Sequence, residues 1–432
     1  MLAEHPLRVL FAGGGTGGHL MPGAATAEAL RVLVPSSRCL FLLTDHKAEK
    51  HCLRALAGFL TARLPATPWD GTVNKLLFGG RSLQAIGRAL DAVRAFRPHV
   101  IVGLGGFRCV APVLLGRALG IRTVLLESNA VAGGAVRVLA PAADLVVLQW
   151  GQAAAGLKAR RVLVAGNPVR AKLFGVRKEA ALRRLGLSPL KHTLLVLGGS
   201  QGALALNRTV HEALSMIYAK RDDLQVLHLT GVDHLPAALE WMNSLPATSY
   251  RPIGFLNQME DAYAAADFVL ARAGGSTLAE LTALGLPAIL VPYPYSAGKH
   301  QHANAEVLAR AGAAIVLDQS ELTAQRLADA IVAFTADAQL RAQVAGCARR
   351  MGRPRAALTL AAEITKMAGL KAQLPADLRV EAQLPGELHL GTQSRPALGG
   401  TLQAHPSPSD GHQDEHSLRN QESTSKKSSQ AA

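Results

Sequence analysis

Cysteine and aromatic residues are both scarce in this sequence, and each shortage excludes a class of protein. The 4 cysteines in 432 residues form no Cys-x-x-Cys pair and no spacing typical of a metal site, which predicts free or buried thiols in a reducing compartment. Aromatic residues make up only 4% of the chain, and neither a base-stacking surface nor an RNA-binding signature is recognisable. A role in binding nucleic acid is therefore not expected.

A leader segment and a membrane-spanning run are also lacking. The first expected strand begins within ten residues of the start, which leaves no room for a signal peptide. The longest apolar run, between Glu280 and Lys299, is interrupted by Pro287, Pro292 and Pro294 and indicates a strand and a loop. We therefore expect a soluble or peripheral protein.

The sequence is rich in basic charge and in small aliphatic residues. With 46 Lys and Arg against 31 Asp and Glu, the net charge of +15 favours an anionic partner such as a membrane surface or a phosphorylated substrate. The hydrophobic content of 49% suffices for large cores, and strand-like apolar runs alternate with helical segments. A chain of this length and pattern is expected to form an α/β protein with two domains.

The stretch that organises the chain is residues 7–19. Its apolar first half predicts a buried strand, and the glycines from Gly13 to Gly18 predict a tight turn before a helix of small residues. Strand, glycine turn and helix are typical of a phosphate-binding site, because helix N-terminal N–H groups and the helix dipole favour anions. His19 stands at the entrance of this helix. A tight turn that binds no ligand is the alternative.

The spacing Gly13-x-Gly15-x-x-Gly18 also fits the dinucleotide-binding fingerprint. That fingerprint requires an acidic residue about 20 positions further along, at the end of the second strand. Asp45 directly follows the expected strand 39–44, but it lies further along the chain than the fingerprint requires. A single match of this kind is weak, so NAD binding stays open as an alternative.

The second half of the chain repeats this arrangement twice. Glycine turns at Gly198–Gly202 and Gly274–Thr277 follow the expected strands 193–197 and 267–271. Two halves that each begin with such a turn predict two doubly wound sheets facing a cleft, with ligands at the carboxyl ends of the strands. Because a dehydrogenase needs one such turn for its cofactor, the additional turns favour a two-domain enzyme that binds a nucleotide diphosphate.

The order of expected strands, turns and helices along the chain gives the domain boundaries, and a change in composition marks the tail. An N-terminal domain is predicted for residues 1–165, a C-terminal domain for 166–340 and closing helices for 341–370. Residues 371–432 lack Phe, Trp and Tyr and are rich in Ser, Gln, Pro and His, which predicts a disordered low-complexity tail. A short partner-binding motif in that tail is the alternative.

Seven short segments, taken together in this order along the chain, carry a resemblance to a known family: Gly14–His19, Gly105–Phe107, Glu127–Asn129, Gly166–Arg170, Gly198–Gly202, Gly274–Glu280 and His300–Asn304. With these segments in family order, the chain resembles the MurG family over about residues 7–367. The resemblance implies the GT-B glycosyltransferase fold, in which two Rossmann-like domains face a cleft. It also implies transfer of N-acetylglucosamine from UDP-N-acetylglucosamine to lipid I (undecaprenyl-diphospho-N-acetylmuramoyl-pentapeptide), which forms lipid II of peptidoglycan.

The donor site implied by the resemblance draws mostly on the second half of the chain. Glycine turns would supply N–H groups for the diphosphate, Arg170 a forked positive charge, and Glu280 an acceptor for the ribose hydroxyls. Gln301 and Asn304, in an expected polar loop, would contact the sugar. Each assignment has an alternative. Glu280 would otherwise be a solvated glutamate in a first helical turn, Gln301 and Asn304 ordinary polar loop residues, and Ser200 a simple helix cap. The implied donor-site residues are Thr16, Gly17, Gly18, Asn129, Arg170, Ser200, Leu256, Gly275, Ser276, Thr277, Leu278, Ala279, Glu280, Gln301 and Asn304.

For catalysis the resemblance implies an inverting reaction, in which an acceptor hydroxyl attacks the anomeric carbon while UDP leaves from the opposite face. A positioned base typically contributes about 10²- to 10⁴-fold to such a step, and His19 is the candidate. The helix N-terminus is expected to favour its neutral form, which accepts a proton. A structural histidine is the alternative. The sequence has no Asp-x-Asp motif, so helix ends and Arg170 are expected to meet the charge of the leaving group without an obligatory metal. No cofactor is expected either.

Phe107 and Glu127 fall on the implied acceptor side. The family usually has Tyr at the position of Phe107 and His-Glu-Gln at residues 126–128, where this chain has Leu-Glu-Ser. The acceptor contacts are therefore less closely specified by the resemblance than the donor contacts.

Because the implied acceptor is a membrane lipid, contact with a bilayer is also expected. The segment Leu76–Phe78 lies beside Lys75, Arg81 and Arg88, which fits a shallow apolar insertion among basic groups. A core-facing helix is the alternative. The protein is thus expected on the cytoplasmic face of the bacterial inner membrane, as a peripheral protein on an anionic surface with cell-wall synthesis proteins as partners.

Other functions stay open on the sequence alone. Another GT-B enzyme would glycosylate a different lipid, such as a diacylglycerol. A UDP-N-acetylglucosamine 2-epimerase would share the fold but needs acid and base carboxylates near the sugar, which are not found. An NAD enzyme and a non-enzymatic sugar-nucleotide-binding module complete the set, although the module would leave His19 without a role.

Overall fold

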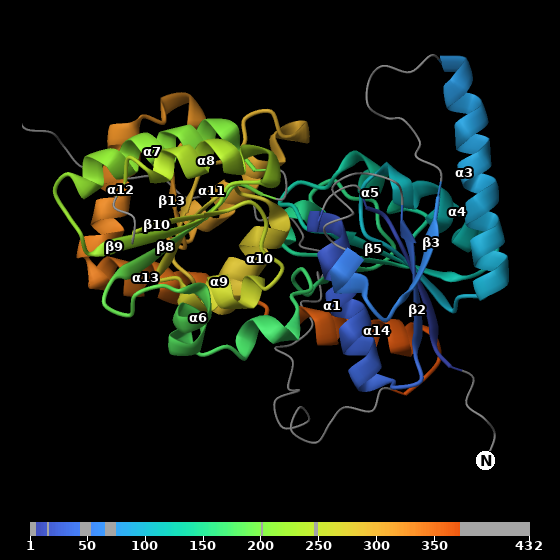
Figure 1. The fold of residues 1–432 in the computed structure, drawn as a ribbon. Helices are drawn as coiled ribbons and strands as arrows, with labels where there is room; N and C mark the ends of the chain where they lie inside the picture. The colour runs from blue at the N-terminus through green and yellow to red at the C-terminus, as the bar shows by residue number, and fades with distance from the viewer. Residues whose placement is uncertain are drawn as a thin grey trace, which may run out of the picture. The chain divides into compact units, whose positions relative to one another are not determined.

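The computed structural model describes residues 6–14, 17–43, 53–64, 75–199, 202–245 and 249–371, and for residues 75–83 only their backbone. Within these residues the chain forms two parallel sheets, each with a hydrophobic core on both faces and helices covering them (Figure 1). The α/β class expected from the sequence is confirmed. The predicted tail lies outside the described residues from residue 372 onward.

The first sheet has seven strands in the order β3-β2-β1-β4-β5-β6-β7. Its strands are β1 (Arg8–Ala12), β2 (Arg38–Leu43), β3 (Leu60–Arg63), β4 (Val100–Gly103), β5 (Arg122–Glu127), β6 (Leu145–Leu148) and β7 (Val162–Val164). The helices along this part of the chain are α1 (Gly17–Leu33), α3 (Lys75–Phe96), α4 (Val110–Ala118) and α5 (Gly134–Leu139).

The second sheet has six strands in the order β10-β9-β8-β11-β12-β13. Its strands are β8 (His192–Leu197), β9 (Leu224–Leu229), β10 (Tyr250–Ile253), β11 (Phe268–Ala271), β12 (Ala288–Leu290) and β13 (Ile315–Val316). Its helices are α6 (Lys178–Leu185), α7 (Leu204–Tyr218), α8 (Leu235–Met242), α9 (Met259–Ala265), α10 (Gly275–Leu284), α11 (His300–Arg310), α12 (Ala324–Ala336) and α13 (Ala338–Met351), and α14 (Ala356–Met367) follows.

The strand order fixes where a ligand can bind. In each sheet the order reverses once, between β1 and β4 in the first and between β8 and β11 in the second. At such a reversal the two connecting segments leave to opposite faces of the sheet and open a crevice at the carboxyl ends of the strands. The glycine turns predicted after residues 12, 197 and 271 all follow strands at these two points.

Helix α14 links the end of the chain to the beginning. Leu360 and Ile364 belong to the same hydrophobic core as Leu20 and Leu30 of α1, and the two helices lie side by side (Figure 1). This helix comes after the last strand of the second sheet but packs on the first. The predicted division into domains at residues 165 and 340 stays a prediction.

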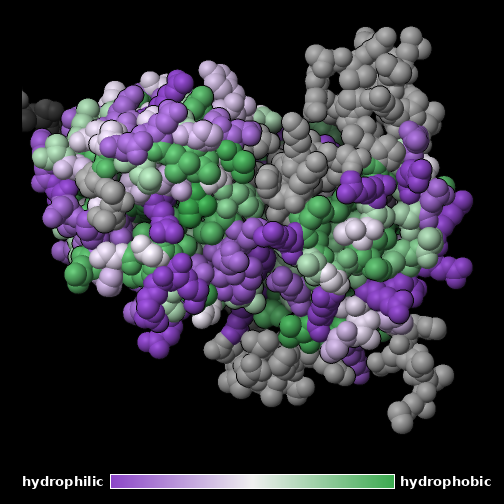
Figure 2. All heavy atoms as spheres, viewed as in Figure 1, coloured by the Kyte–Doolittle hydropathy of each residue, from purple (hydrophilic) through white to green (hydrophobic). Residues whose placement is uncertain are grey.

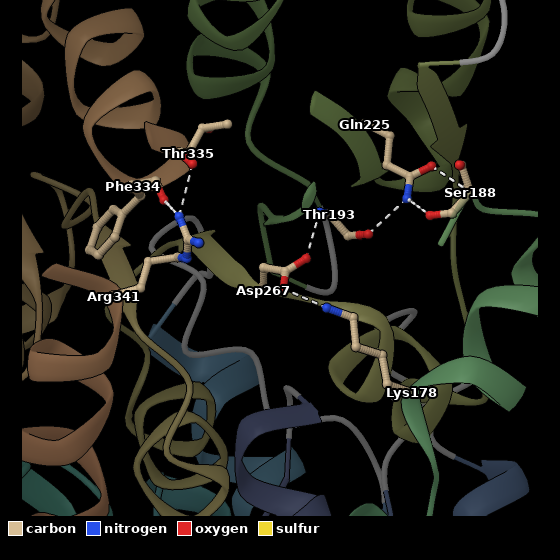
Figure 3. Close-up of polar contacts among 8 residues, drawn as sticks. All are labelled: Lys178, Ser188, Thr193, Gln225, Asp267, Phe334, Thr335 and Arg341. Atoms are coloured by element: carbon tan, nitrogen blue, oxygen red, sulfur yellow. Dashed lines mark hydrogen bonds and ion pairs between the residues drawn. The ribbon is translucent and has the colours of Figure 1, made fainter. Parts of the chain in front are cut away.

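Polar side chains at the amino ends of the second sheet's strands form hydrogen bonds and an ion pair with one another (Figure 3). The Gln225 amide donates to Thr193 Oγ1 at 2.9 Å and to the Ser188 carbonyl at 2.7 Å. Asp267 accepts from the Thr193 N–H at 2.8 Å and pairs with Lys178. These groups therefore tie β8, β9, β11 and α6 together at the end opposite the glycine turns.

A second buried hydrogen-bond chain, the His228 chain, connects β9 and β10 to α7. The Asn207 Nδ2 donates to the Thr230 carbonyl at 2.9 Å, so its Oδ1 accepts from His228 Nε2 at 3.1 Å. His228 Nδ1 then accepts from the Tyr250 hydroxyl at 2.8 Å. Burial lowers the pKa of His228 to about 3, so the neutral ring satisfies every member of the chain.

One local prediction is wrong. Residues 299–304 were expected to form a polar loop, but a helix, α11, begins at His300 and contains Gln301 and Asn304. The reversal needed to start it is made by Lys299, whose backbone is left-handed with φ of 54°. After that residue the sequence contains neither glycine nor proline up to Arg310, so nothing interrupts the helix.

Candidate active site

The His19 ring occupies the crevice of the first sheet, at the reversal between β1 and β4. It lies at the start of α1, and Gly105 follows β4 with φ of +96°. A Cβ at Gly105 would lie 2.9 Å from His19 Cδ2 and 3.2 Å from its Nε2. The ring therefore packs directly on the Gly105 backbone, and glycine is required there both for the backbone angle and for the space.

The surroundings of His19 favour the neutral imidazole. Burial lowers the pKa of His19, and the positive charge of Arg108 lowers it further. Arg108 lies in the short 3₁₀ helix Phe107–Cys109 that follows Gly106. Both causes act in the direction expected from the helix N-terminus, since each disfavours a second positive charge on the ring. At neutral pH the ring can accept a proton.

Glu127, at the end of β5, holds the loop that follows it. Its Oε1 accepts from the Asn129 backbone N–H and from Asn129 Nδ2, both at 2.9 Å, and its Oε2 accepts from the Gly133 N–H at 2.7 Å. The carboxylate is buried and thus fixes the shape of residues 128–133. Phe107, the other residue on the predicted acceptor side, is 47% exposed.

Asn304 connects this loop to the second sheet. Its Oδ1 accepts from the Ala130 N–H at 2.7 Å, and its Nδ2 donates to Asn129 Oδ1 at 3.1 Å and to the Ala273 carbonyl at 3.0 Å. The side chain is fully buried. In this arrangement both amide N–H groups are used by the protein, so Asn304 acts as a bridge between β5's loop and the end of β11.

The start of α10 touches two loops of the first sheet. Ser276 Oγ donates to the Gly18 carbonyl at 2.6 Å and accepts from Asn167 Nδ2 at 3.2 Å. A Cβ at Gly275 would lie 2.4 Å from the Ser128 carbonyl oxygen, so the close approach requires glycine. These contacts bring the third glycine turn next to His19.

Glu280 lies further along α10, and its carboxylate is held by a tyrosine. The Tyr263 hydroxyl on α9 donates to Glu280 Oε2 at 2.6 Å. Burial raises the pKa of Glu280, while this hydrogen bond and the charge of Arg170 act in the opposite direction. Arg170 is itself buried, and its Nε has no hydrogen-bond partner within the described chain.

The remaining predicted donor-site residues have mixed surroundings. Gln301 Oε1 accepts from the Tyr293 N–H at 2.9 Å. Leu256 packs against the core of the second sheet, and Leu278 and Ala279 are buried in that core. Thr277 is half-buried, and Gly17 begins α1. Thr16 and Ser200 lie outside the described residues.

Three residues at the site were not singled out by the sequence analysis: Tyr263 beside Glu280, Arg108 beside His19 and Asn167 beside Ser276. Asn167 stands in a segment that resembles the family, which was a usable signal. Tyr263 and Arg108 act through contacts between separate elements, and no sequence spacing indicates such contacts.

Within the part of the chain that the structure describes, no three His, Cys, Asp or Glu side chains gather in a way that would hold a metal ion. Helices long and apolar enough to cross a membrane are also not found in that part.

Two family models match the chain, one on each sheet. The glycosyltransferase family 28 N-terminal domain matches residues 9–148, and the glycosyltransferase family 28 C-terminal domain matches residues 193–360.

Curated relatives and solved structures are similar over most of the chain. A protein of Halothermothrix orenii, named UDP-N-acetylglucosamine--N-acetylmuramyl-(pentapeptide) pyrophosphoryl-undecaprenol N-acetylglucosamine transferase, is 36% identical over 367 residues, covering 82% of this chain and 97% of the relative. The crystal structure of Acinetobacter baumannii MurG has a TM-score of 0.65 at 24% identity, covering 84% of this chain and all of that one. A UDP-N-acetylglucosamine 2-epimerase reaches a TM-score of 0.63 at 14% identity, over 86% of this chain and 98% of that one, which concerns the fold alone.

Proposed function

This chain belongs to the MurG family of glycosyltransferases, which has the GT-B fold, and we propose that it transfers N-acetylglucosamine from UDP-N-acetylglucosamine to lipid I, forming lipid II. The observation that carries this proposal is the hydrogen bond from Ser276 to the Gly18 carbonyl. It joins the start of α10, where the donor diphosphate is expected, to the residue before His19. The identity to named transferases favours this function over the epimerase, which shares only the fold.

The donor is proposed to bind at the carboxyl ends of β8 and β11. Helices α7 and α10 both begin there, and neither helix has a side chain that caps its first N–H groups. Such N–H groups attract the oxygens of a diphosphate. The buried Arg170 Nε, which lacks a partner in the described chain, is a further donor suited to an anion.

His19 is proposed as the general base. The acceptor hydroxyl of lipid I gives its proton to the neutral imidazole while its oxygen bonds to the anomeric carbon of the sugar. The bond from that carbon to the diphosphate breaks on the opposite face, and the electron pair leaves with UDP. The helix N-termini and Arg170 then face the negative charge that develops on the leaving group.

Contact with the membrane is proposed for the surface of α3, α4 and α5, which neighbour one another in that order. Leu114 on α4 is 46% exposed and Val138 on α5 is 69% exposed, and the neighbouring Arg117 and Arg137 are exposed cations. Apolar side chains among cations suit the boundary of an anionic bilayer.

The α3 residues predicted to insert stand in the described helix, but their side chains are outside the described part. In the view of Figure 2, hydrophobic areas on the visible face are interrupted by hydrophilic residues. We propose that the protein acts on the cytoplasmic face of the inner membrane, with cell-wall synthesis proteins as partners, because the acceptor proposed for it is a membrane lipid.

One incubation tests the function. The full chain is mixed with radiolabelled UDP-N-acetylglucosamine and a lipid I analogue, and the label is followed into lipid while free UDP is measured. Labelled lipid II and an equal amount of UDP are expected, with loss of turnover in His19→Ala. Conversion of the sugar nucleotide without acceptor would instead indicate an epimerase. Binding of UDP without any turnover would indicate a binding module, and binding of NADH a dehydrogenase.

A further inference from the structure

Tyr263 is the one side chain from another helix for which the structure gives a hydrogen bond to the Glu280 carboxylate, within the described residues. The phenol ring belongs to the hydrophobic core of the second sheet and is 3% exposed, so packing fixes its two torsions. Its hydroxyl is therefore presented at a fixed place, 2.6 Å from Glu280 Oε2. This short distance is typical of an O–H group that donates to a carboxylate.

The direction of the Glu280 side chain matters for what the carboxylate can reach. In a helix the Cα–Cβ bond tilts towards the N-terminus, so Glu280 is directed back to the first turn of α10. That turn lies at the carboxyl end of β11, at the crevice of the second sheet. With Oε2 held by Tyr263, the other oxygen, Oε1, is left to accept from a ligand at the crevice.

A free glutamate at this position would not hold one orientation. Its carboxylate is carried on three rotatable bonds, and ordering such a side chain costs conformational entropy. The bond to Tyr263 removes much of this freedom before a ligand arrives, which is how preorganisation improves affinity. Burial raises the pKa of both Glu280 and Tyr263, and the positive charge of Arg170 opposes that rise.

From this geometry we propose that Tyr263 is a positioning residue for nucleoside recognition, which orients Glu280 so that its free oxygen accepts from a ribose hydroxyl of the bound nucleotide. The inference rests on the proposed function, since it assumes a ribonucleoside diphosphate in the crevice. Tyr263 does not itself touch the nucleotide. Removing the Tyr263 hydroxyl is therefore expected to reduce the preference for the ribose hydroxyl, rather than nucleotide binding in general.

The experiment compares UDP with 2′-deoxy-UDP and 3′-deoxy-UDP by isothermal titration calorimetry on the full chain. In the parent protein at least one deoxy analogue is expected to bind at least about tenfold more weakly than UDP, because a carboxylate then loses its partner. In Tyr263→Phe this preference is expected to fall to within about threefold. The substitution keeps the ring and removes only the hydroxyl, so the core stays filled.

Tyr218→Phe is the matched control. The Tyr218 hydroxyl also donates a hydrogen bond within the second sheet region, to the Ser249 carbonyl at 2.8 Å, but at the far end of α7. Tyr218→Phe should lower the stability by a similar amount and leave the preference for UDP unchanged. A cycle with Glu280→Gln tests whether the effect passes through Glu280. In that background Tyr263→Phe should change the preference by less than about twofold, because the effects of two residues acting as a unit are not additive.

The outcomes separate the inference from the proposed function. If the parent protein prefers UDP and Tyr263→Phe keeps that preference, the inference is overturned while the transferase function stands. A parent protein that makes lipid II but binds both deoxy analogues as tightly as UDP would overturn it as well. Absence of UDP binding by the parent protein would overturn the proposed function itself, and the inference with it.

Discussion

Gly105→Ala offers a direct test of His19 as the base, because it acts on the ring without changing it. The added Cβ would lie 2.9 Å from His19 Cδ2, about 0.5 Å closer than the 3.4 Å at which ordinary contact begins. The other atom within 4 Å is the Leu126 carbonyl oxygen of β5, at an ordinary contact distance of 3.8 Å, so the imidazole is the part that moves. A displacement approaching 1 Å costs on the order of 10²-fold in a step that depends on orientation.

We therefore expect kcat for lipid II formation to fall by about 10- to 100-fold in Gly105→Ala, with the KM for UDP-N-acetylglucosamine nearly unchanged. The substitution also strains the backbone by about 1–3 kcal/mol, because φ is +96° at this residue.

Gly120→Ala is the matched control, since its φ is +71° and no atom lies within 4 Å of its Cβ position. The control should lose similar stability and keep full turnover. Steady-state kinetics at saturating acceptor, with thermal unfolding of both variants, measure the two effects. Full turnover by Gly105→Ala would refute the role of His19 as base.

Three further predictions use other parts of the structure. Arg108→Ala should raise the pKa of His19, because it removes a positive charge, and so move the acid limb of the kcat/KM profile to higher pH; an unmoved limb would mean that the limb is not due to His19. His228→Leu leaves two buried polar groups unpaired and should lower the free energy of unfolding in urea by about 2–6 kcal/mol, whereas His228→Gln, which still donates at the Nε2 position, should lose less. Leu114→Ser should weaken binding to anionic vesicles in flotation assays, while Leu190→Ser, which changes a leucine 91% exposed next to β8, should not; equal binding by both variants would contradict the membrane surface.

The folded state adds a pH dependence of stability with a definite sign. His19 and His228 both have a pKa lowered from the ordinary value of 6.5, so the folded protein stays unprotonated where the unfolded chain takes up protons. Each group therefore makes the free energy of unfolding fall as the pH drops below about 6.5, by up to about 1.4 kcal/mol per pH unit. For His228 this loss continues towards pH 3, where its own pKa lies.

Strands buried on both faces were predictable, and edge strands were not. The expected strand 193–197, which is apolar from Leu194 to Leu197, lies within β8, and the expected strand 267–271 lies within one residue of β11. β10 contains Pro252 and half-exposed residues, and a proline argues against a strand unless the strand lies at an edge, as β10 does. β3 is another edge strand, four residues long with little burial, and no apolar run marked it.

The glycine turns of the site were predictable because the backbone angle or the close approach at these positions admits only glycine. A turn that must reach φ of +96° at Gly105, or allow the Ser128 carbonyl within 2.4 Å of a Cβ position at Gly275, leaves glycine in the sequence. The contacts of Tyr263 and Arg108 leave no such mark. Their side chains have ordinary roles in many sequences, and only the packing of separate elements against one another brings them to the site.

Gln301 and Asn304 illustrate how hydrogen-bond capacity separates residues that look alike in the sequence. Both carry an amide on the same face of α11, and both were predicted to contact the sugar. Asn304 has two N–H donors, and both are used, by Asn129 Oδ1 and by the Ala273 carbonyl. A sugar could bind it only by displacing one of these bonds, which would leave a buried acceptor unpaired at a cost of about 1–3 kcal/mol. Gln301 is half-buried, and its side chain accepts from the Tyr293 N–H, which leaves its amide N–H groups for a ligand. A sugar contact through Gln301 therefore requires no rearrangement, whereas one through Asn304 would have to break the bridge between the loop of β5 and the end of β11.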